Sequence, residues 1–221
     1  MVNIAINKAH YPVTVLGPGR RIGLWLQGCR IQCAGCVAQD TWAADPGRVI
    51  SVARLLTWCK SVTEKSAETL EGITISGGEP FDQPKALAAL LDALHLWRRT
   101  SALPLDILCY SGYPLKTLQK RHAALLQKLD ALIPEPYVDA APLTQLWRGS
   151  ANQSLILLSP LGVTRYTPYL DAAAGDFDKR IQIQSDGQRL WCIGLPARGD
   201  MEKLAQKAAE RGLTLHSVSW R

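Results

Sequence analysis

The sequence lacks the apolar segments that take a chain into or across a membrane. No apolar run approaches the ~20 residues that span a bilayer, and Met1–Leu16 contains no long apolar core of a secretory signal. These absences predict a cytoplasmic protein with no membrane partner. Thiols stay reduced in that compartment, so the six cysteines of the chain are not expected to form a disulfide framework.

The sequence also lacks any cluster of basic residues, although its net charge is +6. Lysine and arginine never occur in runs longer than two, and they are scattered along the chain. A diffuse positive charge fits an acidic partner or a nucleotide-like cofactor, but it more often reflects only a soluble surface. No nucleic-acid partner is specifically indicated.

A third absence concerns metal ligands. Cys29, Cys33 and Cys36 form a C-x3-C-x2-C loop, but no second C-x2-C pair follows, and the four histidines are isolated. Three thiolates leave one position of a four-iron cluster without a protein ligand, and such an open position is where a metal centre does chemistry. The loop is therefore interpreted as a reactive [4Fe–4S] motif. A structural zinc site is the weaker alternative because its fourth ligand is missing.

The other three cysteines fit a packed core. Cys59 lies on the apolar face of a predicted helix, and Cys109 and Cys192 lie in apolar runs. A buried cysteine behaves as a small apolar residue, so these three are predicted to pack and not to react. A second cluster is not expected.

A glycine-rich turn follows a predicted strand further along the chain. The β-branched run 72–76 leads directly into Gly77-Gly78-Glu79-Pro80. Glycines at the end of a strand let the backbone approach a ligand closely, because no Cβ stands in the way. The turn is therefore a candidate ligand-binding segment.

Strands and helices alternate through most of the chain. Strands are predicted at 2–6, 13–16, 22–26, 72–76, 105–110 and 131–133, and helices at 52–63, from about 84, and at 115–129, with Ser51 and Asp82 as candidate caps. This alternation predicts an α/β fold of parallel βαβ units, in which ligands bind beyond the carboxyl ends of the strands. The cysteine loop, Gly77–Glu79 and Tyr110–Gly112 each follow a strand, so they are predicted to converge on one edge.

The composition of the sequence changes near residue 160. Residues 160–175 resemble a linker or loop, and residues 181–194 read as a β-hairpin around Asp186-Gly187. A helix at 200–211 with Gly212 as its stop and a strand at 213–218 would follow. The chain is therefore divided into a core domain, residues 1–160, and a small C-terminal ββαβ extension, residues 161–221.

Together, the cysteine loop and the G-G-E-P turn resemble the paired motifs of the radical S-adenosylmethionine (SAM) superfamily. Within it, the sequence is similar to the activating proteins of anaerobic ribonucleotide reductase and, more loosely, to other glycyl-radical-enzyme activases. The resemblance spans roughly residues 3–158. Besides the two motifs, it is carried by Gly17–Arg20, Thr41–Trp42, Ser111–Tyr113, Trp147–Ser150 and Asn152–Gln153.

The resemblance implies a partial (β/α) barrel, a [4Fe–4S] cluster and SAM as cofactors. Cys29, Cys33 and Cys36 would bind three irons, and SAM would bind the fourth. The implied SAM contacts are Gly35 and Val37 at the adenine, Gly77, Gly78 and Glu79 at the methionine end, and Ser111 at the methionine or ribose. The reduced cluster would cleave SAM to a 5′-deoxyadenosyl radical that abstracts a hydrogen atom, with no catalytic residue needed beyond cluster and SAM.

The resemblance also implies partners: a large glycyl-radical enzyme as substrate and a reducing electron donor of the flavodoxin or ferredoxin type. Departures from the family pattern leave the substrate open, since the chain has Ala34 where proline is usual, Ala38 where asparagine is usual, and a changed segment at 134–137. These departures and the extension favour, as an alternative, an enzyme that modifies a small molecule or peptide. A non-catalytic Fe–S electron carrier ranks last, because it would have no use for Gly77–Pro80.

Overall fold

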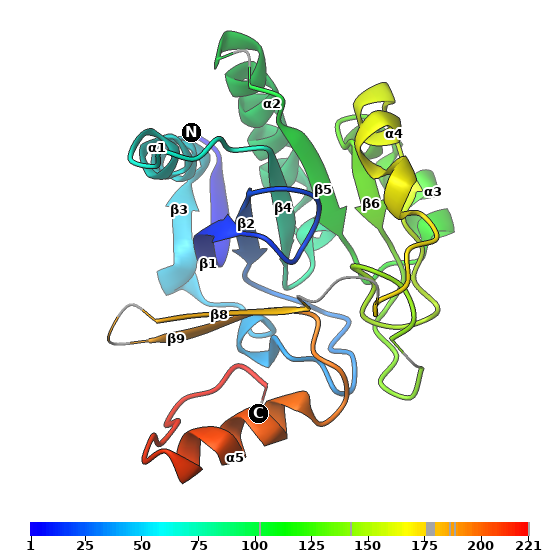
Figure 1. Ribbon diagram of the computed structural model, residues 1–221. Helices are drawn as coiled ribbons and strands as arrows, with labels where there is room; N and C mark the ends of the chain where they lie inside the picture. Colours follow the sequence, from blue (N-terminus) through cyan, green and yellow to red (C-terminus); the bar gives the residue numbers. More distant parts are fainter. Residues whose placement is uncertain (102, 142, 176–179, 186, 188, 221) are drawn as a thin grey trace.

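The computed structural model describes residues 1–221 except 102, 142, 176–179, 186, 188 and 221, and it shows a mixed α/β protein (Figure 1). Its strands and helices, in chain order, are β1 (Asn3–Val13), β2 (Arg21–Leu26), β3 (Val49–Ser51), α1 (Val52–Glu64), β4 (Gly72–Gly77), α2 (Pro84–Ser101), β5 (Asp106–Tyr110), α3 (Leu115–Leu126), β6 (Ala131–Ile133), β7 (Ile156–Leu157), α4 (Pro160–Tyr166), β8 (Ile181–Ser185), β9 (Leu190–Gly194) and α5 (Asp200–Glu210). None of the described helices is both long and apolar enough to cross a bilayer.

The central sheet has seven strands in the order β3-β1-β2-β4-β5-β6-β7. Its middle strands β2, β4, β5 and β6 run parallel, while β1, β3 and β7 pair antiparallel with their neighbours. The register pairs Leu26 with Gly77, and Tyr110 with Ile133. The carboxyl ends of these strands therefore lie side by side, and the loops that follow them leave the sheet at the same edge.

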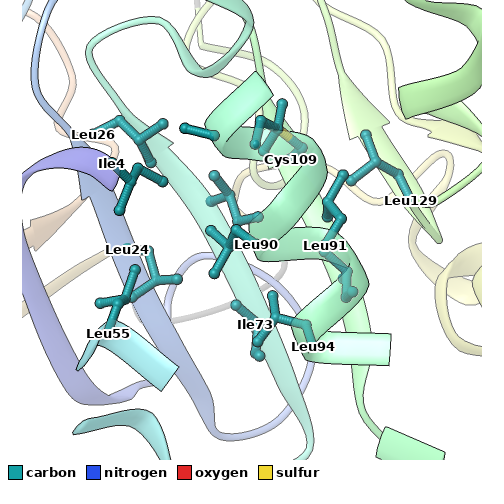
Figure 2. Packing of buried hydrophobic residues seen from close by; sticks show 14 of the residues in the cluster. Ile4, Leu24, Leu26, Leu55, Ile73, Leu90, Leu91, Leu94, Cys109 and Leu129 are labelled. Carbon is teal, nitrogen blue, oxygen red and sulfur yellow. The ribbon is translucent and has the colours of Figure 1, made fainter. Parts of the chain in front are cut away.

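Helices α1, α2 and α3 cover one face of the sheet and form the main core with it. Leu55 of α1 and Leu90 of α2 pack with Ile73, Ile75 and other buried strand residues (Figure 2). Successive residues of a strand point to opposite faces. Trp25, Ser76 and Tyr110 each follow a strand residue of this core, so they face the side without these helices.

Most predicted elements are confirmed, including the Ser51 cap, whose side chain accepts from the Arg54 N–H. Asp82 does not act as a cap in the structure: its carboxylate binds Arg30 and Tyr113 instead. The helix predicted to Leu129 ends at Leu126. The predicted strand at 13–16 is an error, since β1 already ends at Val13.

The predicted linker at 160–175 is wrong, because it contains helix α4. The Ser159 side chain caps α4 by accepting from the Gly162 N–H, and Pro160 occupies its first turn, where a missing N–H does no harm. Gly162 is needed there, because a Cβ would lie 1.9 Å from the Asp130 carbonyl oxygen. The glycine and proline were therefore signals of helix packing and not of a loop.

The extension contains the predicted hairpin (β8 and β9) and helix α5, with Gly212 at φ +76° after it. The hairpin packs on the core through Ile193, which contacts the cluster of Val13, Val15 and Leu16. The predicted strand at 213–218 is wrong. Residues 213–218 pair with no described strand and instead lead to Ser219, whose carbonyl accepts from the Gln39 N–H just after the cysteine loop.

The division at residue 160 stays a prediction. Tyr166 of α4 is fully buried and packs with Leu108 and Ile133 of the central sheet. Residues just after 160 therefore share a core with those before it.

Candidate functional site

A cavity of about 190 Å³ opens at the carboxyl edge of the parallel strands. It is lined by the cysteine loop after β2, by Gly77–Glu79 at the end of β4, and by Tyr110–Gly112 at the end of β5. The predicted convergence of these three segments is confirmed. Trp25, Ser76 and Tyr110, which face away from the helices, form its floor on the sheet.

The cysteine loop turns sharply and is tied at its base. Gly28, Gln32 and Gly35 have φ values of +99°, +52° and +74°. The Gly28 N–H donates to the Thr41 carbonyl at 2.7 Å, and the Cys29 N–H donates to the Trp42 carbonyl at 3.0 Å. The loop is thus closed on itself by its own downstream segment, which fixes where the three thiols lie.

The donor set suits an iron–sulfur cluster. Cys29, Cys33 and Cys36 are all unpaired, and all three line the cavity. Burial raises the pKa of the Cys29 and Cys33 thiols, so their thiolates need positive charge from a bound metal. The Ala38 N–H donates to the Cys36 sulfur at 3.4 Å, an interaction of the kind that tunes cluster sulfurs.

A single bound metal ion gains no support from the geometry. Among the described residues, no three His, Cys, Asp or Glu side chains are grouped so as to hold one ion. A four-iron cluster makes a different demand, because each thiolate binds its own iron. Cys59 and Cys109 are buried in the core as predicted, and Cys192 is half-buried on β9.

The turn after β4 presses against the cysteine loop. A Cβ on Gly78 would lie 2.1 Å from the Gly28 carbonyl oxygen, and one on Gly77 would lie 2.3 Å from the Leu26 nitrogen. The Gly78 N–H donates to Leu26, and the Glu79 N–H donates to Gly28. The close approach that the glycines permit is therefore first of all to the chain's own backbone.

The Glu79 carboxylate joins the two strand-end turns. It accepts from the Ser111 hydroxyl at 2.8 Å, from the Gly112 N–H at 2.8 Å and from the Phe81 N–H at 3.0 Å. Its side chain is 1% exposed, and burial raises its pKa to about 7 against the lowering effect of these donors. The Ser111 hydroxyl donates a hydrogen bond to Glu79 and accepts one from the Tyr113 N–H, so it holds the turn together.

All nine predicted site residues line this one cavity: Cys29, Cys33, Gly35, Cys36, Val37, Gly77, Gly78, Glu79 and Ser111. Sequence reasoning missed Tyr137, Gln153, Leu195 and Pro196, which also line it. Gln153 lay in a segment of family resemblance, which was a usable signal. Leu195 and Pro196 carried none, because only the fold brings the turn after β9 to this edge.

The sequence is similar to a known protein family and to several named proteins. The family profile described as "4Fe-4S single cluster domain" matches residues 15–156. The anaerobic ribonucleoside-triphosphate reductase-activating protein of Vibrio cholerae is 32% identical over 153 residues, covering 65% of this chain and 92% of that protein. The protein of the same name from enterobacteria phage T4 is 29% identical over 141 residues, covering 64% of this chain and 86% of that protein.

Shorter or weaker matches extend beyond these proteins. The pyruvate formate-lyase-activating enzyme of Staphylococcus aureus is 35% identical over 82 residues, which is 37% of this chain and 33% of that enzyme. The crystal structure of QueE from Escherichia coli matches with a TM-score of 0.37 and 20% identity, covering 50% of this chain and 52% of that one.

Proposed function

The chain belongs to the 4Fe-4S single cluster domain family and to the family of the anaerobic ribonucleoside-triphosphate reductase-activating proteins, and we propose that it is a radical SAM activase. Its cofactors are a [4Fe–4S] cluster and SAM. The observation that carries the proposal is the meeting of the three cysteines, Gly77–Glu79 and Ser111 in one cavity.

The proposed fold is a partial (β/α) barrel of the radical SAM type. Four parallel strands carry helices α1, α2 and α3 on one face, and the cavity lies on the other face at the carboxyl edge. Ligands of parallel α/β sheets bind at that edge. The ends of the parallel strands therefore form a rigid surface against which a cofactor can bind.

Cys29, Cys33 and Cys36 are proposed to hold three irons, which leaves one coordination position for SAM. The bound pair supplies the chemistry, in which reductive cleavage of SAM yields a 5′-deoxyadenosyl radical able to abstract a hydrogen atom. The protein holds the cluster and SAM in position and excludes water from the cavity. Trp25 and Tyr110 line the cavity as large, partly buried rings that keep solvent from its floor.

The SAM contacts stay proposals at the level of single residues. The methionine amino group donates hydrogen bonds, so carbonyl oxygens of this turn are proposed to accept from it, while the N–H groups of Gly78 and Glu79 donate within the chain. Gly35 and Val37 are proposed to flank the adenine. Glu79 and Ser111 support the methionine end by fixing the turn, since both side chains are buried and bonded to each other.

The proposed substrate is a backbone glycine of a large partner enzyme, reached through the open side of the cavity, with electrons from a flavodoxin or ferredoxin type of donor. One observation favours an alternative, modification of a small molecule or peptide. Gly194, Leu195 and Pro196 line the cavity from outside the matched family region, which ends at residue 156. The extension could therefore give the site a different substrate.

The test is 5′-deoxyadenosine release. Protein reconstituted anaerobically with iron and sulfide, then given dithionite and SAM, is expected to produce 5′-deoxyadenosine detectable by mass spectrometry. Cys33→Ala is expected to lose most bound iron and this product, while Cys192→Ala keeps both, because Cys192 is half-buried on β9 and is not among the residues that line the cavity. No product from fully loaded wild-type protein would reject radical SAM chemistry.

A second measurement addresses the substrate. Incubation of the loaded protein with a co-expressed glycyl-radical enzyme is expected to give a glycyl-radical signal in electron paramagnetic resonance. SAM cleavage that proceeds without that signal would favour the alternative substrate class.

A further inference from the structure

Residues at the far end of the chain bind to the segment that directly follows the cysteine loop. The Gln39 N–H donates to the Ser219 carbonyl at 2.7 Å, and the Asp40 N–H approaches the same oxygen at 3.4 Å. The Ser219 hydroxyl donates to the Val37 carbonyl at 2.9 Å, and the Gln39 side-chain amide donates to the Trp220 carbonyl at 3.1 Å. Two residues thus make four hydrogen bonds to positions about 180 residues earlier.

These bonds fill a gap in the local structure. Residues Gln39–Thr41 form a short 3-10 helix, and its N-cap residue, Ala38, makes no side-chain capping bond. The first N–H groups of a helix have no partner within it and are normally satisfied by a polar N-cap side chain. Alanine has none to offer. The Ser219 carbonyl supplies the missing acceptor from outside.

The supported segment is also a wall of the cavity. Val37 and Ala38 line it beside Cys36, and Ala38 donates its N–H to the Cys36 sulfur. We infer that Ser219 and Trp220 form a strap that holds residues 37–40 as the adenine-side wall, so that SAM binding depends on the extension. Ser219 is a positioning residue in this scheme, because it acts through Val37 and Gln39. The inference rests on the proposed SAM site.

The extension contacts the cavity at a second point, so its contact with the site is not limited to the strap. Gly194 and Leu195 line the cavity after β9, and the Leu195 N–H donates to the Arg180 carbonyl at 3.1 Å. Ile193 anchors the same turn by packing with Val13 and Leu16. The hairpin fixes one side of the extension, and the strap fixes the other.

The strap can be tested with a chain that stops at Val218 and with the milder variant Ser219→Ala. Ser217→Ala is the matched control, since Ser217 is an exposed serine of the same segment. Amide hydrogen exchange of a peptide covering residues 37–42 is measured in the iron-free protein, so this readout needs neither cluster nor activity. The SAM dissociation constant and iron content are measured after anaerobic loading, and thermal unfolding reports global stability.

Truncation is expected to speed exchange in residues 37–42 by roughly tenfold or more and to weaken SAM binding by roughly tenfold, since several hydrogen bonds are lost together. Ser219→Ala removes one bond, so a change of roughly two- to fivefold is expected in both measurements, with Ser219→Thr restoring it. Iron content is expected to stay near the wild-type level, because the truncated chain keeps the bonds from Gly28 and Cys29 to Thr41 and Trp42 that hold the cysteine loop. Ala38→Asn in the truncated chain is expected to slow exchange again, because asparagine caps helices well.

The outcomes separate the strap from the proposed function. If wild-type protein binds no SAM, the proposed function fails, and exchange in the iron-free protein still decides whether the strap exists. If wild-type protein binds SAM and truncation changes neither exchange nor affinity, the strap is overturned while the proposed function stands. Loss of iron on truncation would also overturn it, because the strap is assigned to the wall and not to the cluster.

Discussion

At the scale of single residues, Glu79 shows how a motif can locate a site without giving the role of each side chain. The G-G-E-P sequence identified the turn and its place in the cavity. It could not show that the carboxylate turns inward, because its partners Ser111 and Gly112 lie 32 and 33 residues away. In the structure Glu79 forms a buried connection between two turns, while its predicted contact with SAM stays a proposal.

This burial has a measurable effect on stability. The pKa of Glu79 is about 7 in the folded protein against an ordinary value of 4.5, so between these pH values the folded state keeps a proton that the unfolded chain has released. Stability should therefore fall as pH rises through that window, by at most about 3 kcal/mol. Glu79→Gln is expected to flatten this dependence in urea unfolding of the iron-free protein.

The control for this experiment is Glu202→Gln, which changes an exposed glutamate of α5. It should keep the wild-type slope. An unchanged slope in Glu79→Gln as well would mean that Glu79 does not hold the proton.

Gly78 is a second residue whose role the sequence located but did not explain. The motif alone predicts close approach of a ligand, whereas the nearest obstacle in the structure is the Gly28 carbonyl oxygen, 2.1 Å from the point that a Cβ would occupy. Gly78→Val must push the turn and the cysteine loop apart. A loss of roughly 1–3 kcal/mol in unfolding free energy is expected, together with reduced iron per chain.

Gly175→Val provides the comparison for Gly78→Val, since no atom lies within 4 Å of its Cβ position. It should leave both quantities near wild type. A Gly78→Val protein with normal iron and stability would show that the two segments can separate freely.

At the scale of elements, the sequence predicted the helices and strands whose positions depend on residues close by in the chain. The Ser51 cap, the apolar stripe of α2 and the Asp186-Gly187 hairpin signal all gave elements close to those observed. The misplaced linker at α4 and the false strand at 213–218 both border on contacts between distant residues. Gly162 of α4 packs against the Asp130 carbonyl, and residues 213–218 lead to Ser219, whose carbonyl accepts from the Gln39 N–H.

One short element connects the cysteine loop to the turn that follows β5. Asp82, in the 3-10 helix Pro80–Asp82, accepts from the Arg30 backbone N–H at 3.1 Å and from its guanidinium at 2.8 Å. It also accepts from the Tyr113 hydroxyl at 2.6 Å. Because Arg30 follows Cys29 directly, this contact restrains the cysteine loop from its outer side.

Asp82→Ala should therefore loosen the loop without unfolding the protein. Arg30 is largely exposed, so the ion pair contributes little to global stability. Iron release to a chelator is expected to quicken by roughly three- to tenfold, because Asp82 also accepts from the Arg30 backbone and from Tyr113. Asp92→Ala is the matched control, since Asp92 pairs with Lys128 on the surface far along α2. Equal release rates in the two variants would argue that Asp82 does not restrain the loop.

At the scale of the whole molecule, alternation of strands and helices was enough to predict an α/β fold with its site at the carboxyl edge. It did not predict the return of the extension to that edge, nor the ionic group at the opposite ends of the strands. Arg21 begins β2 and Asp106 begins β5. Pairing of side chains 85 residues apart leaves no periodic trace in a sequence.

The ionic group is fully buried and extensively bonded. Arg21 donates to both Asp106 oxygens, at 3.1 and 2.6 Å, and to the Thr74 hydroxyl at 2.7 Å. The Tyr166 hydroxyl donates to Asp106 from α4, and Arg165 approaches it at 3.0 Å. The group therefore joins β2, β4 and β5 to α4 at the edge of the sheet opposite the cavity.

Asp106→Asn would leave Arg21 charged and uncompensated in the interior. A loss of roughly 3–5 kcal/mol in the free energy of unfolding is expected, measured by urea denaturation of the iron-free protein. Tyr166→Phe keeps the ion pair and removes one donor, so a smaller loss of about 1 kcal/mol is expected.

Replacement of Asp106 should lower the stability of the protein without changing cofactor binding in the cavity at the opposite edge of the sheet. Under conditions where Asp106→Asn remains folded, its iron content and SAM affinity should match wild type, because its partners Arg21, Arg165 and Tyr166 are not among the residues that line the cavity. A variant that loses iron while still folded would show that the two ends are coupled through β2 and β4. A loss below about 1 kcal/mol would instead mean that water or a shifted side chain compensates Arg21, and that packing alone joins α4 to the sheet.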